Sequence, residues 1–155
     1  MPSQRKFRLT APIVPEEDIQ IAVAQALDLL LMPPALWFAL PIGHIKLPPQ
    51  DAAKLSRIGL RTGLPDILVL HERCYGIELK RQGGVLSRTR MVRTRSGGLR
   101  MVEGQTDMFP KLVKAGCCIA VCRSVDEVLA ALADWQVPLR VTVPAPPMRV
   151  TGGTA

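Results

Sequence analysis

Two carboxylates and one ammonium group stand near one another in the middle of the sequence. Asp66 ends the segment Gly63-Leu-Pro-Asp66, and Glu78-Leu-Lys80 begins twelve positions later. Two carboxylates held side by side need a cation between them, and Mg²⁺ prefers oxygen ligands of this kind. The residue types therefore predict a divalent-metal site whose substrate is a phosphate.

The segment between the two motifs predicts how they meet. Residues Ile67 to Leu70 are apolar, residues 71–74 are polar, and residues Tyr75 to Leu79 are apolar again. This pattern is typical of two antiparallel strands joined by a tight turn. Side chains at i and i+2 share a strand face, so Glu78 and Lys80 point one way and the leucine between them points into the opposite layer.

The length of the turn sets which residues face each other. If three residues stay unpaired, Leu70 faces Cys74 and Asp66 lies opposite Glu78, with Cβ atoms roughly 5 Å apart. A turn of four residues would instead place Asp66 opposite Leu79. We predict the three-residue turn, because it brings the two carboxylates together.

These motifs resemble those of the PD-(D/E)xK nuclease superfamily, and the surrounding sequence resembles its VRR-NUC branch. The likeness covers roughly residues 14–135 and keeps the order of the family. An isolated PD and ExK pair is weak evidence, whereas an ordered set is fairly specific. The matching segments are Glu16-Glu-Asp-Ile-Gln20, Leu55-Ser-Arg-Ile-Gly59-Leu-Arg-Thr-Gly63-Leu-Pro-Asp66, Ile77-Glu-Leu-Lys80, Leu86-Ser87, Lys114-Ala-Gly116 and Ser124-Val-Asp-Glu127.

The resemblance implies an α/β, restriction-endonuclease-like core, in which helices flank a mixed four-stranded sheet in the order αβββαβα. It also implies a DNA endonuclease that depends on Mg²⁺, with Mn²⁺ as a substitute. The family includes enzymes that act on branched or flapped DNA. A non-catalytic DNA-binding accessory protein with the same fold is the alternative hypothesis, although such a protein would not require the Asp, Glu and Lys set.

The resemblance assigns roles to individual residues. Asp66, Glu78, the backbone carbonyl of Leu79 and an acid on the first helix would bind the metal, while Lys80 would position the attacking water. Glu16 fits the spacing of the helix acid. Its neighbour Glu17 is the alternative ligand, and both residues could simply complement the positive end of a helix.

A further site residue, Gln105, departs from the family pattern. The family usually places a glutamine soon after Leu-Ser, whereas here it follows an insert over about residues 88–104. A helix that begins at Gln105 would lose one backbone hydrogen bond at Pro110 or kink there. A start at Thr106 or Asp107 is the alternative, because it places the proline near the first turn, where it is tolerated. Gln105 is therefore either a site residue or a surface glutamine before the helix.

The insert is strongly basic and contains a glycine turn, Ser96-Gly-Gly98, between two short apolar segments. We predict a two-stranded arm in which Val92 pairs with Val102. Arginine guanidinium groups bind phosphate well, so the arm could follow a DNA backbone; a solvated basic loop is the alternative. The candidate DNA-binding residues are Arg88, Arg90, Arg93, Arg95 and Arg100.

The remaining sequence predicts the scaffold. A helix should follow Pro15 and end before Pro33, with Ile19, Val23, Ala26, Leu27 and Leu30 on its apolar face. The other expected elements are a strand over Trp37–Leu40, a helix over Ala52–Arg57, a helix over Gln105–Ala115, a buried strand over Cys117–Cys122, and a helix over Val125–Trp135 capped by Ser124 and Glu127.

Length and composition predict one basic domain. The chain has 155 residues, is 48% hydrophobic and carries a formal charge of +7, which favours a polyanionic partner such as DNA. We divide it into a basic N-terminal arm (1–13), a VRR-NUC domain (14–136) and a mobile Pro/Gly-rich tail (137–155).

Other features predict where the chain works. No apolar stretch is long enough to span a membrane, and no export signal is evident, so we expect a cytoplasmic protein without a membrane partner. The four cysteines are then expected to be reduced thiols. The sequence leaves open whether the chain is a monomer or a homodimer.

Overall fold

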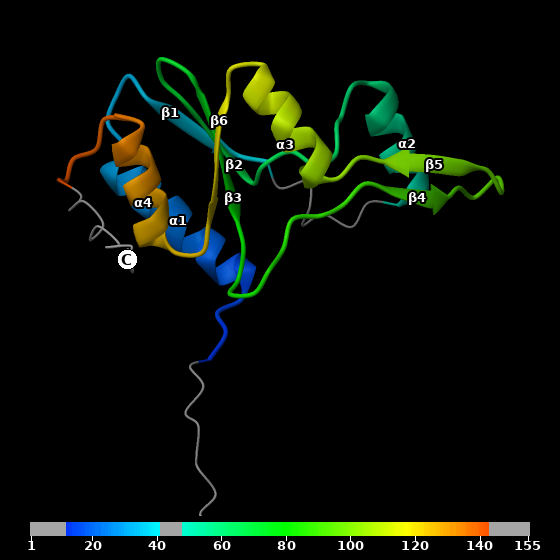
Figure 1. Ribbon diagram of the computed structural model, residues 1–155, viewed down its shortest axis with the longest axis horizontal. Helices are drawn as coiled ribbons and strands as arrows, with labels where there is room; N and C mark the ends of the chain where they lie inside the picture. The colour runs from blue at the N-terminus through cyan, green and yellow to red at the C-terminus, as the bar shows by residue number, and fades with distance from the viewer. Residues whose placement is uncertain (1–11, 41–47, 143–155) are drawn as a thin grey trace, which may run out of the picture.

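The computed structural model describes residues 12–40 and 48–142. The predicted N-terminal arm and the end of the predicted tail lie largely outside these residues. The described part is a mixed α/β structure with a four-stranded sheet and a separate two-stranded sheet (Figure 1). Its elements are α1 (Glu16–Leu30), β1 (Leu36–Ala39), α2 (Pro49–Arg57), β2 (Ile67–Leu70), β3 (Cys74–Leu79), β4 (Arg90–Arg93), β5 (Leu99–Val102), α3 (Gln105–Lys114), β6 (Cys118–Cys122) and α4 (Val125–Asp134).

The main sheet has the strand order β1-β2-β3-β6. β1, β2 and β3 pair antiparallel, and β6 joins β3 in parallel. Leu70 pairs with Cys74, so the turn leaves three residues unpaired and the same register sets Asp66 opposite Glu78. The predicted register is confirmed. β3 is a central strand, and it carries the ExK motif at its end.

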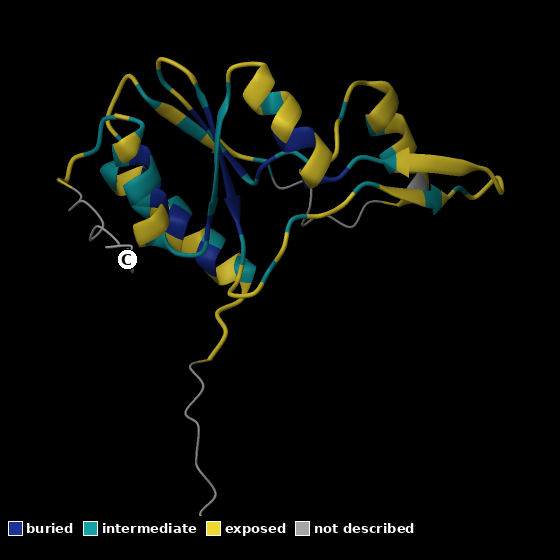
Figure 2. Cartoon of the chain, viewed as in Figure 1, coloured by how far each residue is buried: buried dark blue, intermediate teal, exposed yellow. Residues whose placement is uncertain are grey.

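Two helices cover one face of this sheet (Figure 1). Ile19, Val23 and Leu27 recur every four residues on α1 and are buried against the sheet, as the apolar periodicity predicted. α4 packs beside α1 and contacts β6. Tyr75 of β3 stacks on Trp135 at the end of α4, with ring centroids 5.1 Å apart. Alternate residues of β2 and β3 complete this core, shown in dark blue in Figure 2.

Helix α3 lies on the other side of the sheet and contacts β6 (Figure 1). It buries Met108 and Phe109 and begins at Gln105, so the alternative later start is wrong. Pro110 lies inside the helix at an exposed position, and its lack of an N–H removes one backbone hydrogen bond from the helix. The two-stranded sheet and α2 lie together beside the N-terminal end of α3 (Figure 1).

The hairpin β4–β5 exists as predicted, but its predicted register is wrong. Arg90 pairs with Val102, and Val92 pairs with Arg100 rather than with Val102. The Thr94 N–H donates to the Gly98 carbonyl at 2.8 Å, which closes a loop of three residues. Gly97 adopts a left-handed conformation (φ 84°) within this loop, so the turn centres one residue earlier than expected.

The end of the domain also differs from prediction. Val137 is buried, the Pro138 carbonyl accepts from the Met32 N–H at 3.0 Å, and the Arg140 N–H donates to the Leu30 carbonyl at 2.8 Å. Residues 137–140 therefore close the C-terminal end of α1 and belong to the domain. A mobile tail from residue 137 is wrong for these residues, because an apolar side chain and two backbone bonds hold them.

Two smaller differences have simple causes. α2 begins at Pro49, three residues before the predicted start, because proline is well suited to the first helical turn. β6 is an edge strand, so of its residues only Cys122 is buried. The predicted cap of α4 is confirmed at Ser124, whose Oγ accepts from the Glu127 N–H at 3.2 Å, but the Glu127 carboxylate accepts from the Arg123 N–H at 2.8 Å instead of completing the capping box at Ser124. No helix in the described part of the chain is long and apolar enough to cross a membrane.

Candidate active site

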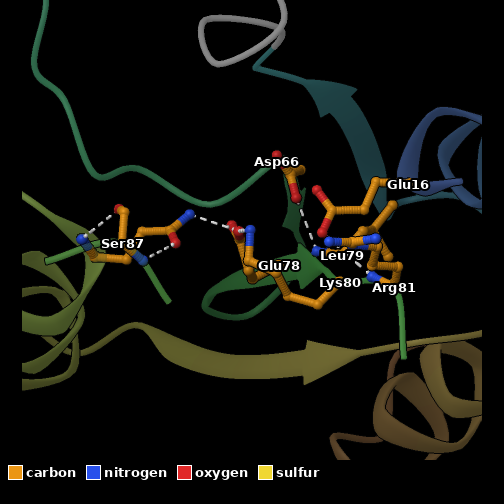
Figure 3. A network of polar contacts seen from close by, with 8 residues as sticks. Glu16, Asp66, Glu78, Leu79, Lys80, Arg81 and Ser87 are labelled. Carbon is orange, nitrogen blue, oxygen red and sulfur yellow. Dashed lines mark hydrogen bonds and ion pairs between the residues drawn. The ribbon is translucent and has the colours of Figure 1, made fainter. Parts of the chain in front are cut away.

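Asp66 is held at the point where β2 begins. The preceding Pro65 is buried, and a Cβ on Gly76 of β3 would lie 2.9 Å from its Cγ, so the two strands meet closely here. One Asp66 carboxylate oxygen accepts from the Leu79 N–H at 2.7 Å (Figure 3). This bond continues the ladder of the sheet beyond β2 with a side chain in place of backbone.

The backbone of Leu79 faces Asp66. The next residue, Lys80, donates its N–H to the Cys122 carbonyl of β6 at 2.9 Å, on the opposite side of the strand. Because N–H and C=O of one strand residue point to the same side, the Leu79 carbonyl lies on the side of Asp66. This is the orientation that a backbone metal ligand would need.

Glu78 is completely buried. Its Oε1 atom lies 2.5 Å from Lys80 Nζ and accepts from Gln105 Nε2 at 2.5 Å, whereas Oε2 has no hydrogen-bond partner. The pKa of the Glu78 carboxyl is raised to about 7, mainly by burial and also by the charge of Asp66, while Lys80 and Gln105 act in the opposite direction. Glu78 is thus a buried acid with one unsatisfied oxygen, an arrangement that is rare unless a ligand completes it.

The Lys80 ammonium is mostly buried beside this acid. Burial alone would lower its pKa, but the bond to Glu78 and the charges of Glu78, Glu16 and Asp66 outweigh that effect and raise the pKa. Lys80 is therefore a retained positive charge on the same strand face as Glu78, as the i, i+2 spacing predicted.

Gln105 joins the site from the first turn of α3. The side-chain Oε1 atom of Gln105 accepts from the Ser87 N–H at 3.0 Å, and the backbone N–H of Gln105 donates to Ser87 Oγ at 3.1 Å (Figure 3). Since the amide oxygen is engaged by Ser87, the amide nitrogen must face Glu78. The Leu86-Ser87 motif and the distant glutamine therefore meet in space despite the insert between them.

Glu16 reaches the site from the first turn of α1. Its Oε1 atom accepts from the Arg81 N–H at 3.2 Å, just beyond the ExK motif, and its side chain lines the same cavity as Asp66 and Glu78. Glu17 is exposed and does not line this cavity. Of the two candidate helix acids, Glu16 is the one that the fold brings to the cluster.

A cavity of about 370 Å³ opens over these residues. Its rim is formed where three distant segments cross at glycines. A Cβ on Gly63, which has a positive φ of 75°, would lie 2.9 Å from the Gly104 backbone, and a Cβ on Gly104 would lie 2.3 Å from the Arg88 carbonyl carbon. Only glycine permits both contacts.

The basic residues divide into two groups. Arg88 and Arg90 line the cavity, whereas Arg93, Arg95 and Arg100 lie farther out along the hairpin. Sequence reasoning missed two further lining residues, Arg61 and Thr62, although they directly precede Gly63. Thr62 Oγ1 donates to the Glu103 carbonyl at 2.8 Å and ties this loop to the base of the hairpin. The signal available in the sequence was that Arg61 is a basic residue close to the Gly63-Leu-Pro-Asp66 segment.

The acids are not arranged as a ready metal centre. Within residues 12–40 and 48–142, no group of three or more His, Cys, Asp or Glu side chains is placed to hold a metal ion. One oxygen of Glu78 contacts Lys80 Nζ, and one oxygen of Asp66 accepts from the Leu79 N–H. Comparisons with protein-family models, curated proteins and solved structures find no match for the chain.

Proposed function

We propose that the chain is a Mg²⁺-dependent DNA endonuclease of the PD-(D/E)xK superfamily, with a restriction-endonuclease-like core of the VRR-NUC type. The observation that carries the proposal is the buried Glu78 Oε2 atom, which has no partner although Asp66 and Lys80 are its neighbours. A solvated strand face would not bury such a carboxylate, because its desolvation would be uncompensated. The element order, with α2 and the hairpin as additions, agrees with the family's αβββαβα core.

The donor set fits Mg²⁺. Asp66, Glu78, Glu16 and the Leu79 carbonyl all offer oxygen, the ligand type that this ion requires, and no soft ligand lies among them. When bound, the ion would polarise the scissile phosphate and lower the pKa of an attacking water. Mn²⁺ accepts the same oxygen ligands and would substitute.

The other residues have separate roles in this proposal. Lys80 would hold the attacking water and stabilise negative charge that develops on the phosphate, since its ammonium is kept charged at the cavity. The Gln105 side chain donates from Nε2 to Glu78 Oε1, which leaves Glu78 Oε2 as the atom that would bind the metal. Arg88 and Arg90 would bind the DNA backbone beside the reacting phosphate. Selectivity for branched or flapped DNA is suggested by the family resemblance alone.

A non-catalytic DNA-binding protein is the second candidate. It is favoured by one observation, the lack of a ready three-ligand metal cluster among the described residues. In that case the basic hairpin would bind DNA and Glu78 would remain paired with Lys80. The chain would then act as a monomer or homodimer without hydrolysing the DNA.

Cleavage of plasmid and branched DNA in Mg²⁺ or Mn²⁺, compared with EDTA, separates the two candidates. We expect nicking only with the metal. Asp66→Asn and Glu78→Gln should each abolish nicking and retain DNA binding, because each removes ligand charge without adding bulk. The exposed Glu72→Gln is the matched control. Full activity of either site variant, or no metal-dependent nicking by the native chain, would contradict the nuclease proposal.

A further inference from the structure

The cavity over Glu78 continues into two further hollows along the hairpin. It shares Arg61, Arg90 and Glu103 with a second hollow of about 610 Å³. The second hollow shares Val92 and Arg100 with a third, of about 700 Å³, near the hairpin tip. Shared lining residues make the three hollows one track that runs from the candidate active site toward the tip.

The hairpin forms one wall of this track. Because Arg90 pairs with Val102 and Val92 pairs with Arg100, all four side chains lie on one face of the two-stranded sheet. This face alternates guanidinium groups with small apolar groups. Such a surface can bind phosphates at the arginines and sugar or base carbon atoms between them.

Helix α2 forms the opposite wall, beside the hairpin in Figure 1. Ala52 and Ser56 line the second hollow, and Gln50 and Ala53 line the third. Ala52 and Ser56 are one turn apart, as are Gln50 and Ala53, so one side of the helix faces the track. Three of these four side chains are small, which keeps the space between helix and hairpin open.

The charge of the track is strongly positive away from the site. Among the described residues, the only acid that lines the two outer hollows is Glu103, and its carboxylate is paired with Lys111. The arginines that line them are Arg61, Arg90, Arg93, Arg95 and Arg100. An extended polyanion therefore matches the track along its length.

We infer that the track between α2 and the hairpin binds one single strand of nucleic acid and leads it to the candidate active site; the ligand class rests on the proposed function. Each hollow has the volume of a small-ligand pocket, about 300–1,000 Å³. A single strand is thinner than a duplex, so it is the form of nucleic acid that hollows of this volume suit better. The described lining residues of the two outer hollows include no aromatic side chain on which a base could stack, so contacts to phosphate should dominate binding.

Fluorescence anisotropy tests this inference without cleavage. The full chain is titrated in EDTA against a labelled oligothymidylate of about 12 nucleotides and against a duplex of equal length, over a range of salt concentrations. The native chain should prefer the single strand. Replacing Arg90 and Arg100 together with alanine should lower the slope of log affinity against log salt by about 1.4, since each lost phosphate contact on a single strand contributes about 0.7.

A second variant tests the width of the track independently of charge. Ser56→Leu adds bulk at an exposed position of the α2 wall without adding a ring on which a base could stack, so it should weaken single-strand binding. A double alanine variant of Arg73 and Arg140, which line none of the three hollows, is the matched charge control and should keep the native slope.

The outcomes separate this inference from the proposed function. Equal affinity for duplex and single strand, with Ser56→Leu binding normally, would overturn the track and leave the nuclease assignment standing. Preferred single-strand binding that both track variants weaken, in a chain that cuts no DNA with Mg²⁺, would support the track and reject the nuclease. A native salt slope in the Arg90 and Arg100 double variant would also overturn the track.

Discussion

Replacing Glu78 with glutamine should stabilise the metal-free fold at alkaline pH. Burial raises the pKa of this carboxyl from an ordinary 4.5 to about 7. The unfolded chain loses the proton near the lower value and the folded chain near the higher one. Between them the folded state binds the extra proton, so this group makes the native fold progressively less stable as pH rises, with no further change above about pH 7.

The size of the effect follows from the same shift. Ionising Glu78 in the fold costs about 3 kcal/mol at pH 8, because each pKa unit corresponds to about 1.4 kcal/mol. Glutamine avoids this cost, but its amide nitrogen takes the place of Oε2, which has no partner, at a cost of about 1–2 kcal/mol. We therefore expect Glu78→Gln to unfold with a free energy about 1–2 kcal/mol above native at pH 8.

Urea unfolding at about pH 5 and pH 8 measures this effect. The difference between Glu78→Gln and the native chain should change by about 2–3 kcal/mol between the two pH values. Glu72→Gln, at an exposed position in the β2–β3 turn, should change stability by less than about 0.5 kcal/mol at both. A Glu78→Gln variant that is strongly and equally destabilised at both pH values would refute the reasoning, because Glu78 would then be a structural partner of Lys80.

Three other predictions concern the same region. Thermal unfolding with and without MgCl₂ should show a larger stabilisation by Mg²⁺ at about pH 8 than at about pH 6, because ligation requires Glu78 without its proton; an equal shift at both would place the ion elsewhere. Lys80→Ala should retain this Mg²⁺-dependent shift yet slow cleavage at saturating DNA by about 10²-fold or more, as judged by single-turnover rates, and near-native turnover would remove Lys80 from the chemistry. Gly104→Ala should lower the free energy of unfolding, measured in urea, by more than about 2 kcal/mol, and Gly98→Ala should lower it by less than about 1 kcal/mol. The new methyl group would lie 2.3 Å from the Arg88 backbone in the first variant and 3.3 Å from the Thr94 hydroxyl in the second. Similar losses in both variants would contradict the close crossing at Gly104.

Local sequence patterns predicted the parts of the fold that depend on local rules. Periodicity placed α1 and its buried residues, and the apolar runs on either side of residues 71–74 placed β2 and β3. The runs alone allowed two registers, and the correct one was chosen because it brings the carboxylates of Asp66 and Glu78 together. The hairpin register failed because two glycines offered two turn geometries, and the sequence does not state which one takes the left-handed position.

Features that depend on distant segments were beyond local reasoning. The contact between Gln105 and Glu78 requires α3 to pack across the sheet, and the spacing of the two residues in sequence gives no measure of that. Arg61 enters the cavity only because Gly63 and Gly104 let two loops cross. The burial of Val137 likewise depends on packing of residues 137–140 against the end of α1. The prolines that follow Val137 in the sequence had instead suggested a mobile tail.

The pairing of Arg90 with Val102 makes the hairpin a removable module. Its first and last residues are direct cross-strand partners, so their Cα atoms stand only about 5 Å apart. A short turn between Thr89 and Glu103 could replace the whole arm without moving Ser87 or Gln105, which hold the acid. Insertions and deletions in the hairpin can therefore change its length or remove it, and so alter this surface of the protein, while the residues around Glu78 keep their positions.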